Sequence, residues 1–325
     1  MRLFALHDTA RLGAAVAKAA GIELSPLEER EFADGEHKSR PLVSVRGEDV
    51  YLLSSLHGGA VRSPADKLLR LVFLAATCRD NGADRVTLLV PYMAYMRKDQ
   101  QTKPRDPVTS RYVATVIEAA QPDMVVALDV HNPAAFQNGF RCRTTHLTMA
   151  EIFADHLAQG MDKTQVVLMS PDSGGIRRTH HLMQAYCADA TRAASFAMME
   201  KHRSEGRVTG DLFAGSVQDC NVIIIDDLIS TGGTILRAAR ACRERGASTV
   251  TAVATHGLFS NGAAELFSDP AVDRVIVSDS AMPFQLGPEH TAPKLEVVSA
   301  APLLASAMQR LHGGGSIHRL LSPAR

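Results

Sequence analysis

One stretch of the sequence, VIIIDDLISTGGTI at residues 222–235, combines residue types that could bind a phosphorylated sugar. Its apolar residues predict a strand that ends in Asp226 and Asp227, at the sheet edge where open parallel sheets bind ligands. Thr231 to Thr234 begin a predicted helix whose N–H groups and dipole favour phosphate. Carboxylates do not bind phosphate but accept hydrogen bonds from vicinal hydroxyls, so the ligand is predicted to carry both groups. The alternative is an acidic helix N-cap.

Two widespread phosphate-binding patterns do not occur in the sequence. A Walker loop requires GxxxxGK followed by Ser or Thr, and the dinucleotide-binding pattern is GxGxxG. Neither is found. The loop at 222–235 therefore represents a third type of phosphate loop.

The composition argues against several classes of function. The 325 residues are 46% hydrophobic and 22% charged, which predicts a globular protein of two domains. Lys plus Arg and Asp plus Glu both total 35, so we expect no broad nucleic-acid or membrane surface. The N-terminus lacks a continuous apolar segment, which predicts no signal peptide or membrane span and a cytoplasmic location. Five cysteines without a CxxC pair favour reduced thiols over disulfides or a zinc site.

Seven short apolar runs rich in β-branched residues predict buried strands. Between them lie stretches with helical patterns, two of which end at a glycine suited to a helix C-cap. This alternation predicts a parallel α/β architecture. The predicted strands are 49–55, 85–92, 124–130, 165–172, 221–227, 249–256 and 274–280, and the predicted helices are 63–82, 108–121 and 234–246.

An internal repeat suggests that the chain contains two related halves. CRDNGADRVT at 78–87 and CRERGASTVT at 242–251 share a helix end, a glycine and a strand start. Duplication of an α/β domain explains the repeat, whereas the alternative is that any such helix–strand junction looks alike. A boundary near residues 145–150 would separate the halves.

The loop at 222–235 resembles the phosphoribosyl-diphosphate-binding loop of type I phosphoribosyltransferases and of ribose-phosphate pyrophosphokinases. Further segments resemble the second family in the expected order, and phosphoribosyltransferases lack the N-terminal part of this series. The sequence is therefore identified as similar to ribose-phosphate pyrophosphokinases over about residues 1–310. The segments are FADGE at 32–36, SVRGEDVYLLSS at 44–55, PYMAYMRKDQ at 91–100, RDPVTSRYVA at 105–114, SPDSGG at 170–175 and KHR at 201–203.

The resemblance implies a fold, a reaction and an assembly. The implied fold is α/β, with two similar type I phosphoribosyltransferase-like domains, each a mostly parallel sheet flanked by helices. Residues 1–147 would bind nucleotide and oligomerise, residues 148–305 would bind ribose 5-phosphate, and residues 306–325 would form a tail that packs on the N-terminal domain. The implied reaction transfers pyrophosphate from ATP to the 1-hydroxyl of ribose 5-phosphate, giving AMP and phosphoribosyl diphosphate. A homo-oligomer, dimer or hexamer, is implied, without nucleic-acid or membrane partners.

The resemblance also implies the roles of individual residues. Lys201 and Arg203 would be catalytic cations on a mobile loop, and Mg²⁺ would be held near His131 and Asp172. The residues implied for ribose 5-phosphate are Arg203, Asp226, Asp227, Ser230, Thr231, Gly232, Gly233 and Thr234. Those implied for ATP are Phe32, Asp34, Gly35, Glu36, Arg97, Lys98 and Asp99.

The sequence departs from the common family pattern at several of these segments. NPAAFQNGF follows His131 where a shorter segment is usual, and Ser230 stands where Asp is frequent. Lys98 is another substitution beside Asp99, and HKSRPL at 37–42 departs from the usual alternating strand. Three alternatives therefore stay open: a non-catalytic regulatory homologue, a phosphoribosyltransferase, and a kinase of another phosphorylated pentose.

Overall fold

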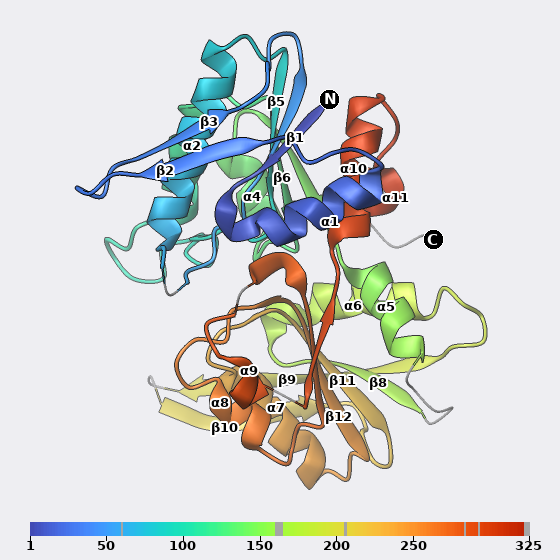
Figure 1. The fold of residues 1–325 in the computed structure, drawn as a ribbon. Helices are drawn as coiled ribbons and strands as arrows, with labels where there is room; N and C mark the ends of the chain where they lie inside the picture. Colours follow the sequence, from blue (N-terminus) through green and yellow to red (C-terminus); the bar gives the residue numbers. More distant parts are fainter. Residues whose placement is uncertain (60, 160–164, 205–206, 283, 292, 322–325) are drawn as a thin grey trace. The chain divides into compact units, whose positions relative to one another are not determined.

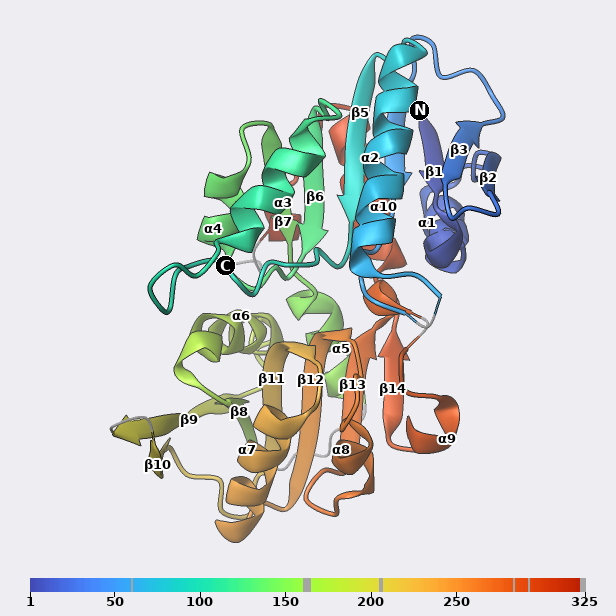
Figure 2. The same ribbon diagram turned by 90° about the vertical axis from the view of Figure 1, so that its left-hand side faces the viewer.

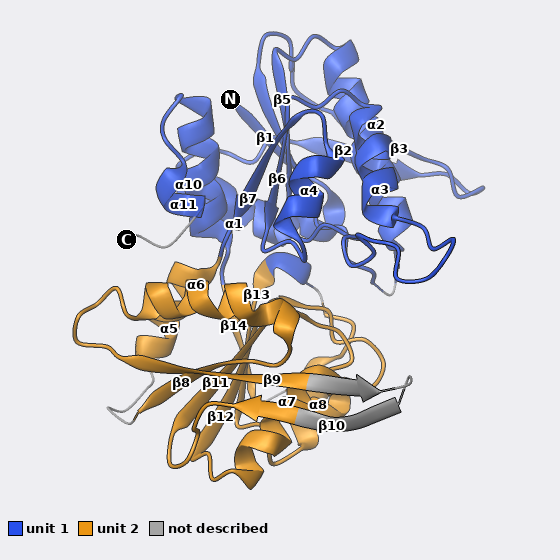
Figure 3. Ribbon diagram, turned by 180° about the vertical axis from the view of Figure 1, so that it is seen from behind, with its two compact units in different colours: residues 1–148, 280–283, 299–321 blue, residues 149–279, 284–298, 322–325 orange. Residues whose placement is uncertain are grey.

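The computed structural model divides the chain into two compact units (Figure 3). The first contains residues 1–148, 280–283 and 299–321, and the second contains residues 149–279 and 284–298. The structure describes residues 1–59, 61–159, 165–204, 207–282, 284–291 and 293–321, without the side chains of 201–211. Within these residues, no helix has the length and apolar character needed to cross a membrane.

The first unit is built on a parallel sheet of five strands, in the order β1-β4-β5-β6-β7. Figure 1 labels three of them, β1, β5 and β6. Its helices lie on both faces, because alternate side chains of these buried strands point to opposite sides. The strands are β1 (Arg2–Ala5), β4 (Asp49–Leu53), β5 (Arg85–Val90), β6 (Met124–Leu128) and β7 (Arg143–Leu147). The helices are the 3-10 turn η1 (His7–Thr9), α1 (Ala10–Ala20), α2 (Pro64–Asp80), α3 (Thr109–Glu118), α4 (Pro133–Gly139), α10 (Ala301–His312) and α11 (His318–Leu321).

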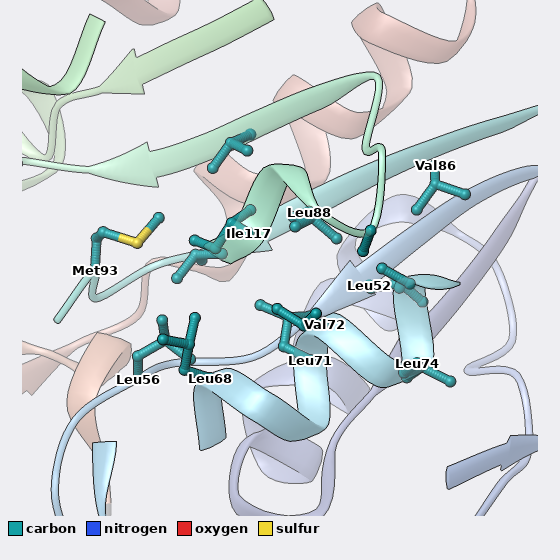
Figure 4. Close-up of a cluster of buried hydrophobic side chains, with 14 of the residues drawn as sticks. Leu52, Leu56, Leu68, Leu71, Val72, Leu74, Val86, Leu88, Met93 and Ile117 are labelled. Carbon is teal, nitrogen blue, oxygen red and sulfur yellow. The ribbon is translucent and has the colours of Figure 1, made fainter. Parts of the chain in front are cut away.

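One face of this sheet packs against α2 and α3 (Figure 2). Leu52 and Leu88 from the strands meet Leu71 and Leu74 from α2, with Ile117 from α3 in the same cluster (Figure 4). All five side chains are fully buried. Burial of a leucine side chain contributes about 1.5–3 kcal/mol, so this cluster stabilises the sheet whose strand β5 leads to the Arg97–Asp99 segment.

The C-terminal helix α10 packs on α1 in the first unit. Gln309 donates to the carbonyl of Ala20 (3.0 Å), and the ring of His312 bonds to the carboxylate of Asp49 (2.7 Å). Residues 299–305, which the sequence assigned to the second domain, therefore belong to the first compact unit. The physical reason is that α10 buries its apolar side, including Leu304 and Met308.

An antiparallel pair, β2 (Leu27–Glu31) and β3 (His37–Pro41), extends from the first unit as a hairpin arm (Figure 1). The first five residues of HKSRPL therefore form a strand despite the departure of this segment from the family pattern. FADGE forms the turn between the two strands: the N–H of Phe32 donates to the carbonyl of Glu36 (2.8 Å), and Gly35 has φ of +91°. Glycine permits that left-handed conformation without steric cost.

The second unit is built on a sheet of seven strands, in the order β10-β9-β8-β11-β12-β13-β14. Only the β9–β10 pair is antiparallel among these strands. The strands are β8 (Val166–Ser170), β9 (Ala194–Ser204), β10 (Arg207–Ala214), β11 (Asn221–Ile229), β12 (Thr249–Gly257), β13 (Arg274–Ser278) and β14 (Leu295–Val298). The helices are α5 (Ala150–Gln159), η2 (Ser173–Gly175), α6 (Ile176–Tyr186), α7 (Gly233–Glu244), α8 (Ala264–Ser268) and α9 (Pro288–Thr291), with the 3-10 turn η3 at Asp279–Ala281 in the chain between the units.

The internal repeat adopts the same backbone geometry twice. Gly82 ends α2 before β5, and Gly246 ends α7 before β12, each with φ of +83°. In both cases the N–H of the next residue donates to the carbonyl five residues back, at 3.0 and 3.1 Å. This is a helix C-terminal motif that requires a left-handed residue, which explains the glycine in both copies.

The side chains of the repeat also make matching contacts. Arg79 in the first unit is paired with Asp123, and Arg243 in the second with Asp273. The same carboxylate oxygen accepts the N–H of the second residue of the following strand, at 2.7 Å in the first unit and 2.6 Å in the second. These matching networks support the predicted duplication. The predicted fold class, two α/β halves with mostly parallel sheets flanked by helices, is confirmed.

Candidate active site

The segment 222–235 has the strand–loop–helix form that its sequence predicts. β11 carries Asp226 and Asp227 near its C-terminal end, and α7 begins at Gly233. Gly232 is the N-cap of α7 with φ of +79°, and a Cβ at this position would lie 3.1 Å from the Cβ of Leu266. The first N–H groups of a helix have no intrahelical partner, so those of α7 can bind an anion beside the loop.

The loop after β12 forms hydrogen bonds with the predicted phosphate loop. The N–H of Ser260 donates to the carbonyl of Ser230 (3.0 Å), and the two side-chain hydroxyls lie 2.8 Å apart. The N–H groups of Leu258 and Phe259 both donate to the carbonyl of Ile229 (2.9 and 3.1 Å). The loop conformation is thus fixed by a neighbouring strand end rather than by its own sequence alone.

The two carboxylates are bridged by an arginine from α6. Arg178 places Nη1 3.1 Å from Oδ1 of Asp226 and Nη2 3.3 Å from Oδ1 of Asp227. Burial raises the pKa of Asp226, the adjacent charge of Asp227 raises it further, and the guanidinium of Arg178 opposes both effects. The site therefore brings two acids and one cation together.

Asp172 lies at the end of β8, in the same unit. Its Oδ1 accepts the N–H of Gly175 at 3.1 Å, and its carbonyl accepts the hydroxyl of Ser170 at 2.6 Å. Its charge contributes to the raised pKa of Asp226. The strand ends of β8 and β11 thus place Asp172 and the acid pair at one sheet edge.

The backbone of KHR lies in β9, although the side chains of Lys201 and Arg203 are outside the described residues. The strand registers align Ile224 of β11 with Met169 of β8, and Met169 with Ala197 of β9. Position 199 of β9 is therefore level with Asp226 of β11, and Lys201 lies two residues, or about 7 Å, farther along the strand direction. β9 extends beyond the sheet edge at which the acid pair lies.

In the first unit, a single amide links two segments with predicted ATP and metal residues. Nδ2 of Asn132 donates to Oδ2 of Asp99 at 2.6 Å, while its Oδ1 accepts N–H groups at the start of α4. The exposed His131 precedes Asn132, so it lies in the same neighbourhood as the Arg97–Asp99 segment. The unusual NPAAFQNGF segment thus begins with an N-cap residue that also binds Asp99.

Lys98 is paired within its own loop. Its Nζ lies 2.5 Å from Oδ2 of Asp106 and 2.9 Å from the hydroxyl of Thr102. Hydrogen bonds from Lys98, which have the largest effect, and from Thr102 lower the pKa of Asp106 to about 2. Arg97 is exposed, so the structure presents Arg97 and not Lys98 as the accessible cation of this segment.

The predicted adenine residues lie at the exposed tip of the hairpin arm. Phe32 is 39% exposed, and the guanidinium of Arg30 lies 5.0 Å from the centre of its ring. Glu31 anchors the base of the tip through ion pairs with Arg62 (3.2 Å) and Arg70. An exposed aromatic ring on an anchored arm is available for stacking with a ligand.

Comparison with known proteins gives one consistent family. Residues 1–120 match the family model described as the N-terminal domain of ribose phosphate pyrophosphokinase, and residues 146–322 match the phosphoribosyl synthetase-associated domain. The chain is 33% identical over 315 residues to the ribose-phosphate pyrophosphokinase of Ureaplasma parvum, covering 94% of this chain and 90% of that protein. It is 33% identical to ribose-phosphate pyrophosphokinase 1 of Streptococcus pyogenes, covering 96% and 94%. The chain belongs to the ribose-phosphate pyrophosphokinase family.

The fold of this pyrophosphokinase also matches a solved structure in the family. Phosphoribosylpyrophosphate synthetase from Mycobacterium smegmatis superposes with a TM-score of 0.85 at 29% identity, covering 97% of this chain and 99% of that one. The resemblance drawn from the sequence motifs is therefore confirmed, together with the enzyme class of a pyrophosphoryl transferase.

Sequence reasoning predicted the loop at 222–235 but missed two residues that contact this segment, Arg178 and Ser260, and a third, Asn132, that contacts Asp99 in the first unit. Arg178 is one of two consecutive arginines after SPDSGG, and nothing in that spacing shows which one reaches the acid pair. Ser260 follows a different strand, with no signal that links it to Ser230. Asn132 had a visible signal, because Asn before Pro is a common helix start.

Proposed function

We propose that this enzyme transfers the pyrophosphoryl group of ATP to the 1-hydroxyl of ribose 5-phosphate, giving phosphoribosyl diphosphate and AMP. The observation that carries this proposal is the geometry of β11 and α7. Two carboxylates, Asp226 and Asp227, precede a loop that leads to the helix N-terminus at Gly233. A ribose with hydroxyls at one end and phosphate at the other has the chemistry that this segment can bind.

The reaction depends mainly on positioning and charge stabilisation. The ribose 1-oxygen forms a bond to the β-phosphorus of ATP, the bond from that phosphorus to the oxygen shared with the α-phosphate breaks, and the hydroxyl proton is released. Alignment of two bound substrates can supply a large part of such a rate enhancement. We assign Lys201 and Arg203 to neutralising the phosphate oxygens, because their strand continues past the edge that holds the acid pair.

Magnesium fits the donor chemistry of Asp172. Its carboxylate offers a hard oxygen ligand, and within the described residues its Oδ2 accepts no hydrogen bond. No cluster of three or more candidate metal-binding side chains occurs within that part of the chain. Asp172 would therefore hold an ion together with water and substrate phosphates. His131, in the first unit, stays a predicted metal residue, with a contact through water. A bound Mg²⁺ would offset phosphate charge.

We assign ATP to the first unit. Phe32 would stack on adenine, with Asp34 and Glu36 nearby, and Arg97 would contact the phosphates. Because the turn lies at the tip of an exposed arm, we propose that it reaches the nucleotide of another subunit in a homo-oligomer. The five free cysteines accord with work in a reducing compartment, which supports a cytoplasmic location.

The proposal is tested by incubating the purified protein with Mg²⁺, ATP and ribose 5-phosphate, and measuring AMP and phosphoribosyl diphosphate by chromatography. Equal amounts of both products are expected, and none without the sugar phosphate. 2-Deoxyribose 5-phosphate should be a poor substrate, because it lacks one of the two vicinal hydroxyls. Folded protein that forms no AMP above the blank, at several phosphate concentrations, would refute the proposal and favour a regulatory homologue. Consumption of phosphoribosyl diphosphate with a nucleobase would instead indicate a phosphoribosyltransferase.

A further inference from the structure

Arg178 was not among the predicted site residues, yet it contacts both members of the acid pair. It lies in the first turn of α6, and its two terminal nitrogens contact one carboxylate each, those of Asp226 and Asp227. The side chain of Arg178 is 17% exposed, that of Asp226 18% and that of Asp227 5%. The three groups are thus largely removed from water and interact strongly.

The guanidinium fixes which carboxylate oxygens remain available to a ligand. Oδ1 of Asp226 accepts two hydrogen bonds, one from Nη1 of Arg178 at 3.1 Å and one from the N–H of Asp227 at 2.8 Å. Oδ2 of Asp226 makes no hydrogen bond within the residues that the structure describes. One oxygen is therefore held by two donors, which leaves the other oriented and open to a sugar hydroxyl.

Two adjacent carboxylates would not hold this arrangement without a cation. Their charges repel, and burial favours the neutral acid over the carboxylate. A planar guanidinium that contacts both groups offsets the repulsion and restricts both side chains. A lysine ammonium is a point charge and cannot place one nitrogen on each carboxylate. The bridging geometry therefore depends on arginine.

We propose that Arg178 is the positioning residue of the sugar site, which holds both carboxylates as oriented acceptors for the ribose hydroxyls. The inference rests on the proposed function, because it takes ribose 5-phosphate as the ligand. Arg178 acts through Asp226 and Asp227 and makes no contact with the reacting atoms. Its loss should weaken the binding of ribose 5-phosphate and leave the binding of ATP nearly unchanged.

The test compares Arg178→Met and Arg178→Lys with wild type and with Arg177→Met. Arg177 is the matched control, because it is the preceding residue on α6, is exposed, and makes no hydrogen bond or ion pair within the described part of the chain. Ribose 5-phosphate binding is measured by calorimetry, and KM is measured separately for each substrate. Circular dichroism melting shows whether each variant is folded.

Arg178→Met is expected to raise the Kd and KM for ribose 5-phosphate about tenfold or more, with the KM for ATP within about twofold of wild type. Arg178→Lys should restore part of the affinity, and Arg177→Met should match wild type. Unchanged sugar affinity in a folded Arg178→Met, or an equal rise in both KM values, would overturn the inference. If Arg178→Met does not fold, Arg178→Lys decides: a selective loss of sugar affinity supports the inference, and wild-type affinity overturns it. Wild type that binds no ribose 5-phosphate refutes the proposed function itself.

Discussion

Replacement of Asp226 by asparagine tests the acceptor role of the acid pair with almost no change in side-chain size. The amide oxygen can still accept the two donors that now bind Oδ1, namely Arg178 and the N–H of Asp227. The amide nitrogen then takes the place of Oδ2, so an acceptor that faces the ligand becomes a donor. The local fold should persist while one charged hydrogen bond to the sugar is lost.

The expected size of the effect follows from the energy of that bond. A hydrogen bond to a charged group contributes about 1.5–3 kcal/mol. Since each 1.4 kcal/mol corresponds to a factor of about ten, Asp226→Asn should weaken ribose 5-phosphate binding by about 10- to 150-fold. ATP binding should be unaffected, because no predicted nucleotide residue lies in β11.

Calorimetric titration with ribose 5-phosphate is the direct assay, and Asp155→Asn is the control. Asp155 lies on α5 in the same unit, and its side chain is 76% exposed, so its replacement should leave affinity at the wild-type value. Equal affinity in wild type and Asp226→Asn would show that this carboxylate accepts no hydrogen bond from the sugar. A large loss of thermal stability in the variant would show that the charge serves the fold instead.

Four further outcomes are expected. Because the pKa of Asp226 is raised, the ligand-free protein should lose stability as the pH rises through that pKa, whereas the affinity for the sugar should increase. Melting and calorimetry from pH 6 to 9 should show these two trends, and both should disappear in Asp226→Asn. Gly232→Ala should weaken sugar-phosphate binding and destabilise by about 1 kcal/mol or more, because φ is +79° and Leu266 lies 3.1 Å from the added Cβ; a wild-type melting temperature and affinity would contradict this. Lys201→Ala should lower kcat by about 10²-fold with a smaller change in the KM for ribose 5-phosphate, and full turnover would remove the catalytic role of the lysine. Asn132→Ala removes a cap and a bond to Asp99, so it should raise the KM for ATP and destabilise by about 1 kcal/mol; unchanged values of both would refute this reading.

The local sequence was sufficient to predict seven of the fourteen strands in the described part of the chain, and the strand–loop–helix form of residues 222–235. The run Val222–Ile225 becomes the buried part of β11, because a strand buried on both faces leaves a continuous apolar pattern, and the helix predicted to begin within Thr231–Thr234 begins at Gly233. The repeated CRxxGA motif likewise predicted two matching junctions, each with its glycine at φ of +83°. The family resemblance followed from motif order alone.

Only the tertiary structure decided which distant residues meet these motifs. Arg178 reaches the acid pair because parallel pairing of β8 with β11 brings α6 over the end of β11, a relation that no local periodicity contains. Asn132 meets Asp99, and α10 returns to α1, for the same reason. Residue type and spacing specify local conformation. Contacts between residues that are 33 to 289 positions apart in the sequence depend instead on how whole helices and strands pack. The sequence thus determined the residue types in the loop, and packing determined which cation contacts its acid pair.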